Sequence, residues 1–311
     1  MRVLVLGVGV LGSYLAHSLL KAGNDVTVLA RGKRYEQLSD DGLAIKHYFQ
    51  KKTTVDRINV ISELKKDDIY DLIFVVMKYN QLPSALLTIA NNLSENIILI
   101  GNNANPKRTE ADIQKLSKSK KKIGFGFQTS AGIREDSGQV ISIHGKGNIT
   151  FGDSNGDLSL EETVKKAFGT HYKVTIEKDI EAWLLTHYVF ILPMNSLLYI
   201  NDFNAKKISK SNVSLNKMVE ATNEGLEVLK ENGVDIIPRS LGKLISDYKK
   251  LYFLLMKIYF KLPMNKFVSG GFDEIVALYN DFKKLKNNAN INIYNWDNLE
   301  KEALNKHQKS K

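Results

Sequence analysis

The 311-residue chain contains no cysteine, few prolines and no long apolar run. Without cysteine it has no disulfide, thiolate nucleophile or Cys-ligated metal; this is typical of a reducing compartment, and we expect a cytoplasmic protein. The six histidines show no HxxxH or similar spacing, so no metal site is predicted. No stretch reaches the ~18–20 apolar residues of a membrane span, since Lys257 interrupts the stretch 251–260. Residues 2–6 run directly into a glycine turn without a small-residue cleavage site, so this end of the chain is uninformative about targeting.

The positive charge of the chain is spread along its whole length. Lysine and arginine number 44 against 34 acidic residues, a net charge of +10, divided as 24 against 19 through Glu177 and 20 against 15 after it. A nucleic-acid surface concentrates its charge on one face or arm. The one dense basic run, Lys118–Lys122, has no interleaved aromatics, and we expect it to be a solvated loop or helix end. We therefore predict no nucleic-acid partner.

Strand-length apolar runs alternate with amphipathic stretches over residues 1–177. Four runs are apolar at consecutive positions, as in a parallel sheet covered on both faces: Val3–Leu6, Val26–Leu29, Leu72–Met77 and Ile97–Ile100. Between the first two, Leu11, Leu15 and Leu19 recur at helical spacing, and Gly23 supplies a stop. Three later runs predict an antiparallel extension: Ile123–Thr129, Gln139–Ile143 and Asn148–Phe151. The fold class is α/β, with a doubly wound parallel sheet of Rossmann type.

Residues 178–311 predict a second, all-helical domain. The expected helices are Ile180–Leu192, kinked at Pro193, then Ser214–Asn232, Leu241–Leu262 and Glu274–Leu285. The Lys/Asn-rich tail after Lys283 predicts a frayed C-terminus. Because no linker-like segment separates the two domains, we expect them to pack with a cleft between them, and a homodimer is left open.

The segment Gly7-Val8-Gly9-Val10-Leu11-Gly12 carries the main chemical signal. GxGxxG alone is weak, but here it follows a predicted strand and opens a predicted helix within a βαβ unit. In that context Gly7 permits the tight turn, Gly9 allows a pyrophosphate to approach the backbone, and Gly12 permits close helix–strand packing. Val10 and Leu11 begin the helix, whose N–H groups and positive dipole end face the phosphates. The motif predicts a dinucleotide site.

The residues after the second predicted strand favour NADP over NAD. An NAD site carries Asp or Glu there to accept from the ribose 2′-hydroxyl, but this chain has Ala30. Arg31 follows, with Lys33 and Arg34 close behind, and arginine holds a phosphate through two parallel N–H bonds. The alternative is a loop of solvated charges in a lysine-rich protein. NADP is the predicted cofactor, held by Arg31 with help from Lys33 or Arg34.

These motifs, together with a set of later residues, resemble the ketopantoate reductase family. The further matching segments are Met77-Lys78, Gly101-Asn102-Asn103, Gly138-x-Val140, Gly147-x-Ile149 and Gly152. The resemblance implies a Rossmann domain joined to a helical domain, and reduction of a 2-keto acid by NADPH in the cleft. It also implies that Met77 and Lys78 contact the cofactor, that Lys78 reaches the substrate edge, and that Asn102 lies near the nicotinamide. Asn103 and Asn105 are equally able to fill an Asx-type turn there.

The first helix of the second domain departs from the family pattern of a Trp, a catalytic Lys two residues later, and Asn four and eight residues beyond. Counting from Trp183 places three apolar residues on those positions: Leu185, Val189 and Pro193. A shift of two residues instead places His187, Ile191 and Asn195 on one helix face. His187 is then a candidate proton donor near neutral pH, although we favour the Trp register.

A late family signature, Arg-x-Thr-Glu, is missing, and Lys266 is the nearby cation.

Three hypotheses remain. The first is an NADPH-dependent reductase of a small-molecule carbonyl substrate, with Lys78, Asn102 and His187 as candidate catalytic residues. The second is a genuine 2-dehydropantoate 2-reductase of pantothenate biosynthesis with a displaced proton donor. The third is a non-catalytic NADP(H)-sensing protein.

Overall fold

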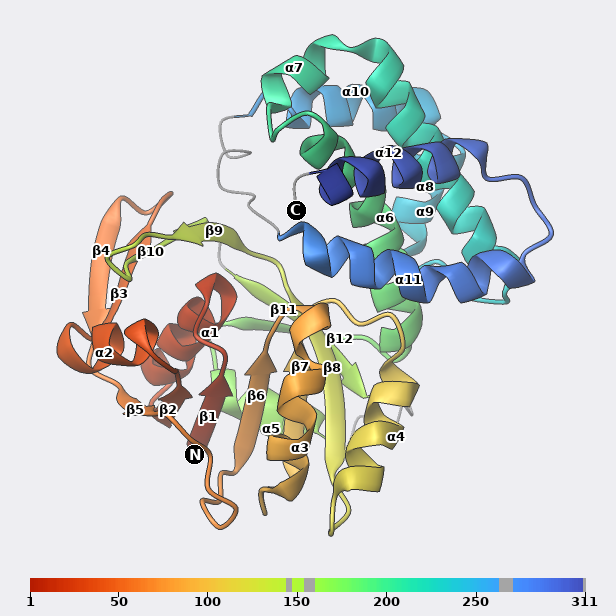
Figure 1. Cartoon of the computed structure of the whole chain (residues 1–311). Coiled ribbons are helices and arrows are strands. Elements are labelled where there is room, and N and C mark those ends of the chain that lie inside the picture. Colours follow the sequence, from red (N-terminus) through yellow and green to blue (C-terminus); the bar gives the residue numbers. More distant parts are fainter. Residues whose placement is uncertain (144–146, 154–159, 263–270, 310–311) are drawn as a thin grey trace. The chain divides into compact units, whose positions relative to one another are not determined.

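The chain divides into two compact units (Figure 1). The computed structural model describes residues 1–143, 147–153, 160–262 and 271–309. The first unit runs from Met1 to Ile180 and the second starts at Glu181. The division therefore falls three residues after the boundary predicted at residue 177.

An eight-stranded sheet forms the centre of the first unit. Its order is β12-β11-β8-β7-β6-β1-β2-β5, and all neighbours are parallel except the pair β8 and β11. The strands are β1 (Arg2–Leu6), β2 (Asp25–Leu29), β5 (Asn59–Ile61), β6 (Leu72–Val76), β7 (Asn96–Ile100), β8 (Lys122–Gln128), β11 (Asn148–Asp153) and β12 (Lys173–Ile176). Because β1 lies between β2 and β6, the chain order reverses at β1. The predicted doubly wound α/β fold is confirmed.

Helix α1 (Val10–Lys21) shows how the local pattern builds the core. Leu15 and Leu19 are fully buried against the sheet, as their i, i+4 spacing predicts. Burial of each stabilises the fold by about 1.5–3 kcal/mol. Gly23, at φ +82°, turns the chain back after the helix. The other helices of this unit are α2 (Lys33–Asp40), α3 (Pro83–Asn91), α4 (Pro106–Leu116) and α5 (Glu161–Phe168).

A second, four-stranded sheet was not expected. Its order is β4-β3-β10-β9, made of β3 (Leu43–His47), β4 (Lys52–Asp56), β9 (Ala131–Arg134) and β10 (Val140–Ile143). The prediction that 139–143 extends the main sheet is wrong, because β10 pairs in parallel with β3 instead. The β3–β4 hairpin has too few consecutive apolar residues to be recognised as strands from the sequence. Its strand β3 nevertheless pairs with β10. Strand β8, from the run 123–129, also differs from the prediction, because it pairs in parallel with β7. Strand β11 does extend the main sheet antiparallel to β8, as predicted.

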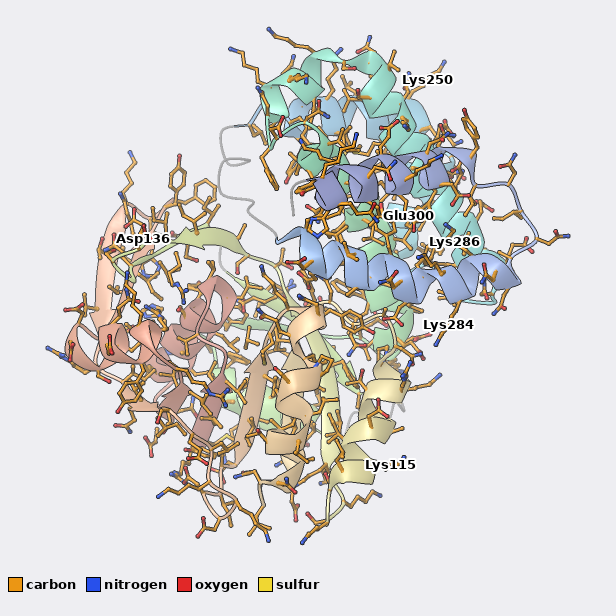
Figure 2. All side chains as sticks on the ribbon, viewed as in Figure 1. Lys115, Asp136, Lys250, Lys284, Lys286 and Glu300 are labelled. Atoms are coloured by element: carbon orange, nitrogen blue, oxygen red, sulfur yellow. The ribbon has the colours of Figure 1, made fainter. Side chains whose placement is uncertain are left out.

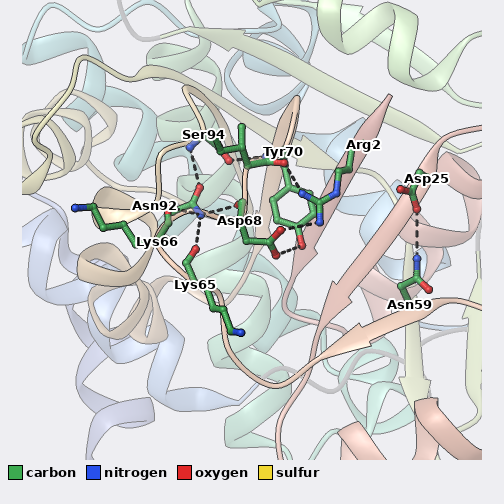
Figure 3. A network of polar contacts seen from close by, with 10 residues as sticks. Arg2, Asp25, Asn59, Lys65, Lys66, Asp68, Tyr70, Asn92 and Ser94 are labelled. Atoms are coloured by element: carbon green, nitrogen blue, oxygen red, sulfur yellow. Dashed lines mark hydrogen bonds and ion pairs between the residues drawn. The ribbon is translucent and has the colours of Figure 1, made fainter.

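A polar network closes the amino ends of β1 and β6 (Figure 3). The Arg2 guanidinium lies 4.3 Å from the Tyr70 ring centroid and 2.7 Å from an Asp68 carboxylate oxygen. The Asn92 amide donates to the Asp68 carbonyl at 2.9 Å, and its oxygen accepts from the Ser94 backbone N–H. These contacts fix loop backbone at the edge opposite the glycine motif, so this charged cluster is structural.

Lys121 joins the same region from the basic run Lys118–Lys122. Its side chain is only 2% exposed, and its Nζ donates to the backbone carbonyls of Asn92 at 2.5 Å and Ser94 at 2.8 Å. Burial lowers the pKa of its ammonium group. The prediction that the whole run is solvated is therefore wrong for Lys121, since loop carbonyls replace water around this cation.

The described residues of the second unit form helices and no strand. They are α6 (Ile180–Ile200), α7 (Ala205–Lys210), α8 (Asn212–Glu231), α9 (Arg239–Ser246), α10 (Lys249–Tyr259), α11 (Phe272–Asn288) and α12 (Tyr294–Lys309). Helix α6 continues through Pro193 to Ile200. The prediction that no stretch is long and apolar enough to span a membrane is wrong for α6, which meets both criteria by length and composition. However, 61% of its apolar window is buried, which is typical of a core helix.

Two helix predictions in this unit are wrong. The expected helix 241–262 is two helices, because the chain leaves the helical path at Asp247 and Tyr248. The expected frayed tail is helix α12, which packs on α8 with Trp296 only 1% exposed. Lys286 of α11 and Glu300 of α12, labelled in Figure 2, form an ion pair at 2.9 Å. Composition alone could not show that the apolar residues of the tail share one buried face.

Candidate functional site

The glycine motif forms a tight turn between β1 and α1. Gly7 has φ +98°, and a Cβ there would lie 2.2 Å from the Val76 carbonyl oxygen on β6. A Cβ on Gly12 would lie 1.9 Å from the Gly7 carbonyl oxygen. No L side chain fits at either position without moving the backbone. These two glycines are therefore required by the fold itself.

Gly9 is different, because nothing lies within 4 Å of the position of its missing Cβ. Its φ of −78° is accessible to any residue, so the backbone does not require glycine there. Gly9 is the N-cap of α1 and has no side chain to bond the first N–H groups of Val10 and Leu11. The open space and the exposed helix N-terminus together fit a pyrophosphate.

A pocket of about 450 Å³ opens over this turn. Its walls come from the glycine loop, the end of β2, α3 and the end of β9, and its lining residues are Leu6, Gly7, Val8, Gly9, Leu29, Ala30, Arg31, Arg34, Met77, Gln81, Ser84, Ala85, Thr88 and Arg134. A second pocket of about 480 Å³ shares Arg31 and Thr88 with the first. A long ligand with its phosphates at α1 can therefore continue past the end of β2. This geometry fits a dinucleotide.

The three predicted cations after β2 take three different places. Arg31 is exposed and lines both pockets. Lys33 is exposed but lines neither pocket. Arg34 is buried, and its guanidinium donates to the Val8 carbonyl at 3.1 Å, the Gly138 carbonyl at 2.7 Å and the Ser13 hydroxyl at 3.1 Å. Arg34 thus stabilises the glycine loop. Its guanidinium hydrogen-bonds to protein groups, namely two backbone carbonyls and one hydroxyl.

The ends of β1, β6 and β7 meet at the same edge of the sheet. A Cβ on Gly101 would lie 2.8 Å from the Met77 carbonyl oxygen, and a Cβ on Gly7 would lie 3.3 Å from the Met77 side chain. Val76 and Ile100 are register partners, so Lys78 and Asn102 each follow two residues after a paired strand end. Met77 lines the cofactor pocket, Lys78 is exposed, and Asn102 is half-buried. Ligands of open parallel sheets bind at such an edge.

The structure separates the three asparagines after β7. Asn103 is buried, donating to the Thr109 hydroxyl at 3.1 Å and accepting from the Asn105 backbone N–H at 2.9 Å. Asn105 is the N-cap of α4 and accepts from the Arg108 N–H at 3.0 Å. Both are used in holding the start of α4. Asn102 has neither of these roles and lies half-buried, two residues after the end of β7.

His187 lies on α6 in the helical unit. Its ring stacks on Trp183, one turn earlier, with ring centroids 5.2 Å apart and an interplanar angle of 7°. Burial lowers the pKa of His187 to about 4. The ring is therefore a neutral imidazole at pH 7, able to donate or accept one hydrogen bond but not to carry the positive charge of an imidazolium.

The Trp register stays a prediction, and the packing of α6 shows where its apolar positions lie. Val189, which that register places on the substrate face, is fully buried, and both it and Trp296 lie within 3 Å of the position of a Cβ on Gly225 of α8. Leu185 is also buried, at 5% exposure. This face of α6 packs into the core of the helical unit, where α6 and α8 approach closely at Gly225. Lys266, the late cation, lies outside the described residues.

Sequence reasoning missed Arg134, Gln81, Ser84 and Thr88 of the pocket. Arg134 lies about 100 residues after Arg31, and no local pattern links the two. Among the described ranges no group of three or more His, Asp or Glu residues could hold a metal ion.

The sheet order, the glycine turn and the pocket at the carboxyl ends of the strands define a dinucleotide-binding domain of Rossmann type. Residues 3–156 match the family described as ketopantoate reductase PanE/ApbA. The N-terminal unit therefore belongs to the ketopantoate reductase family, and the predicted resemblance is confirmed.

Individual proteins agree with this assignment. A 2-dehydropantoate 2-reductase from Pyrococcus horikoshii is 25% identical over 250 residues, which cover 78% of each chain. The structure of a 2-dehydropantoate 2-reductase from Geobacter metallireducens has a TM-score of 0.79 at 18% identity, covering 99% of this chain and 100% of that one. The ternary structure of a D-mandelate dehydrogenase with NADH and anilino(oxo)acetate has a TM-score of 0.77 at 18% identity, covering 99% of both chains. The two structures share the fold of this protein.

Proposed function

We propose that this protein is an NADPH-dependent reductase of a 2-keto acid or a related carbonyl compound. The activity would resemble that of 2-dehydropantoate 2-reductase, which would place it in pantothenate biosynthesis, and catalysis would occur in a cleft between the two units. The observation that carries the proposal is the pocket over Gly9, with Arg31 rather than an acidic residue at the end of β2. A ligand with both a pyrophosphate and a 2′-phosphate satisfies these features together.

The carbonyl substrate is supported by the relatives and by the strand edge. The 2-dehydropantoate 2-reductase relative is named for a 2-keto acid, and anilino(oxo)acetate has an oxo group next to a carboxylate. When bound, NADPH would supply a hydride to the carbonyl carbon. The carbonyl oxygen then needs one proton, and the product is the 2-hydroxy acid. Lys78 and Asn102 each follow two residues after one of a pair of strand ends, and this supports them as the groups that would serve that oxygen.

The roles of the candidate catalytic residues follow from their chemistry. The Lys78 ammonium would donate the proton to the carbonyl oxygen, and the Asn102 amide would orient the carbonyl group. His187 would act as a hydrogen-bonding group for the substrate, because the low pKa leaves its ring neutral at pH 7. A lysine would also attract the substrate carboxylate.

The proposal is tested by following NADPH oxidation with a panel of 2-keto acids that includes ketopantoate. We expect turnover with at least one of them, and loss of about 10²–10⁴-fold in Lys78→Met, the usual effect of removing a positioned acid. Lys46→Met, which removes an exposed lysine from β3, is the matched control and should keep full activity. Tight NADPH binding with no turnover of any compound would favour the sensing alternative. Failure to bind NADPH would contradict both the proposed reductase and the sensing alternative.

A further inference from the structure

Arg134, the last residue of β9, lines the same pocket as Arg31. Both side chains are exposed, and within the described part of the chain neither guanidinium has a hydrogen-bond or ion-pair partner. The two arginines come from different sheets, since Arg31 follows β2 of the main sheet and β9 belongs to the second. The pocket therefore has cations on two separate walls.

Strand β9 is held close to the start of α1. A Cβ on Gly132 would lie 2.9 Å from the Val10 side chain and 2.1 Å from the Ile141 carbonyl oxygen of β10. Only glycine lets β9 approach both α1 and β10 this closely. The approach brings the second sheet to the rim of the cofactor pocket.

The turn after β9 is fastened to α2. Arg34 donates to the Gly138 carbonyl at 2.7 Å, and Gln37 donates to the Asp136 carbonyl at 2.9 Å. Arg34 also bonds Val8 of the glycine loop, so one buried guanidinium joins α2, the loop and the β9–β10 turn. The position of Arg134 relative to Arg31 is thereby fixed within a single rigid region of the first unit.

The charge around Arg134 is not balanced by acids in the pocket. Three arginines and no carboxylate line it. Burial, followed by the positive charge of Arg134, lowers the pKa of Arg34 to about 10, which places Arg134 in electrostatic contact with Arg34. Clustered cations of this kind are stabilised when an anion binds between them.

We propose that Arg134 is a second residue that holds the 2′-phosphate of NADPH, opposite Arg31. The proposal rests on NADPH being the cofactor of the proposed function. The pyrophosphate already has the N–H groups at the start of α1. Arg134 instead lines the pocket together with Ala30 and Arg31, at the end of β2, where the adenosine ribose of a dinucleotide binds. Specificity for NADPH would then depend on one arginine beside each of the two sheets.

The test compares two fragments that differ only in the 2′-phosphate, adenosine 2′,5′-bisphosphate and 5′-AMP, by titration calorimetry on the full chain. Arg134→Met should weaken the bisphosphate about 10–100-fold, the effect of losing a charged hydrogen bond. Binding of 5′-AMP should change less than about threefold. Arg134→Lys keeps the charge without the two-pronged geometry and should recover part of the affinity. Arg57→Met is the matched control, because Arg57 is an exposed arginine of the same unit that lines neither pocket.

Several results would overturn the assignment. They are an equal loss for both fragments in Arg134→Met, no loss at all, an equal loss in Arg57→Met, or a wild type that does not prefer the bisphosphate. An unchanged melting temperature of the ligand-free variants shows that their fold is intact, and Arg134→Lys decides the question if Arg134→Met does not fold. Carbonyl turnover is measured separately. Arg134-dependent bisphosphate binding without turnover would retain this assignment while rejecting the proposed reductase.

Discussion

The contrast between Gly9 and Gly12 gives the sharpest test of the cofactor site. Both belong to the same motif, yet a Cβ on Gly9 meets nothing within 4 Å, whereas a Cβ on Gly12 would lie 1.9 Å from a backbone oxygen. Gly9→Val should therefore leave the ligand-free fold close to its original stability, within about 1 kcal/mol for the changed N-cap. Gly12→Val should destabilise the first unit strongly, because backbone must move.

The expected size of the ligand effect follows from linkage. At a concentration of 100 Kd, NADPH stabilises the wild type by about 2.7 kcal/mol. For a unit of about 180 residues, each kcal/mol raises the melting temperature by about 2–4 °C, so the expected shift is about 5–11 °C. The Gly9→Val side chain would occupy the space of the pyrophosphate, and the shift should disappear.

The assay is thermal unfolding of the wild type and both variants, with and without NADPH. A Gly9→Val variant that keeps the full NADPH shift would show that the phosphates bind elsewhere. A Gly12→Val variant as stable as the wild type would show that the close approach of the turn and α1 is incorrect. Either result would refute the argument from the glycine geometry.

Four further variants test other parts of the structure. Arg31→Ala should weaken NADPH binding by about 1.5–3 kcal/mol and leave NADH nearly unchanged in a fluorescence titration; equal effects would contradict the role of Arg31. Because burial lowers the pKa of His187 to about 4, the unfolded chain binds more protons between about pH 6.5 and 4, so this group makes the wild type less stable as the pH falls through that range. Urea unfolding should show that this loss is smaller in His187→Gln, and identical pH profiles would argue against a buried neutral ring. Lys286→Met should cost about 3 kcal/mol in chemical unfolding, because it leaves the buried Glu300 carboxylate without its cation, and a cost under about 1 kcal/mol would contradict that burial. Leu185→Lys should destabilise the helical unit by about 3–5 kcal/mol without a gain in ketopantoate reduction, whereas a clear gain would restore the Trp register.

The sequence by itself determined the α/β class, the four central strands and the glycine turn. These features are local, because a buried parallel strand needs consecutive apolar residues and a φ of +98° needs glycine at one named position, Gly7. The start and end of α1 could be predicted for the same reason. Ala30 and Arg31 could be placed beside the glycine turn because their position directly after a strand fixes where they lie.

Only the tertiary structure decided which of several similar residues serves the site. Arg34 and Arg134 are both arginines, but Arg34 is buried by carbonyl groups far away in the sequence, whereas Arg134 is brought to the pocket by β9. In the same way, Val189 became core rather than ligand surface because Gly225 of a different helix lets α8 approach it. An arginine side chain can bond protein carbonyls or face a pocket, and a valine can lie in the core or at a surface. The choice depends on which distant backbone packs beside it, and that information is not present in any local stretch of sequence.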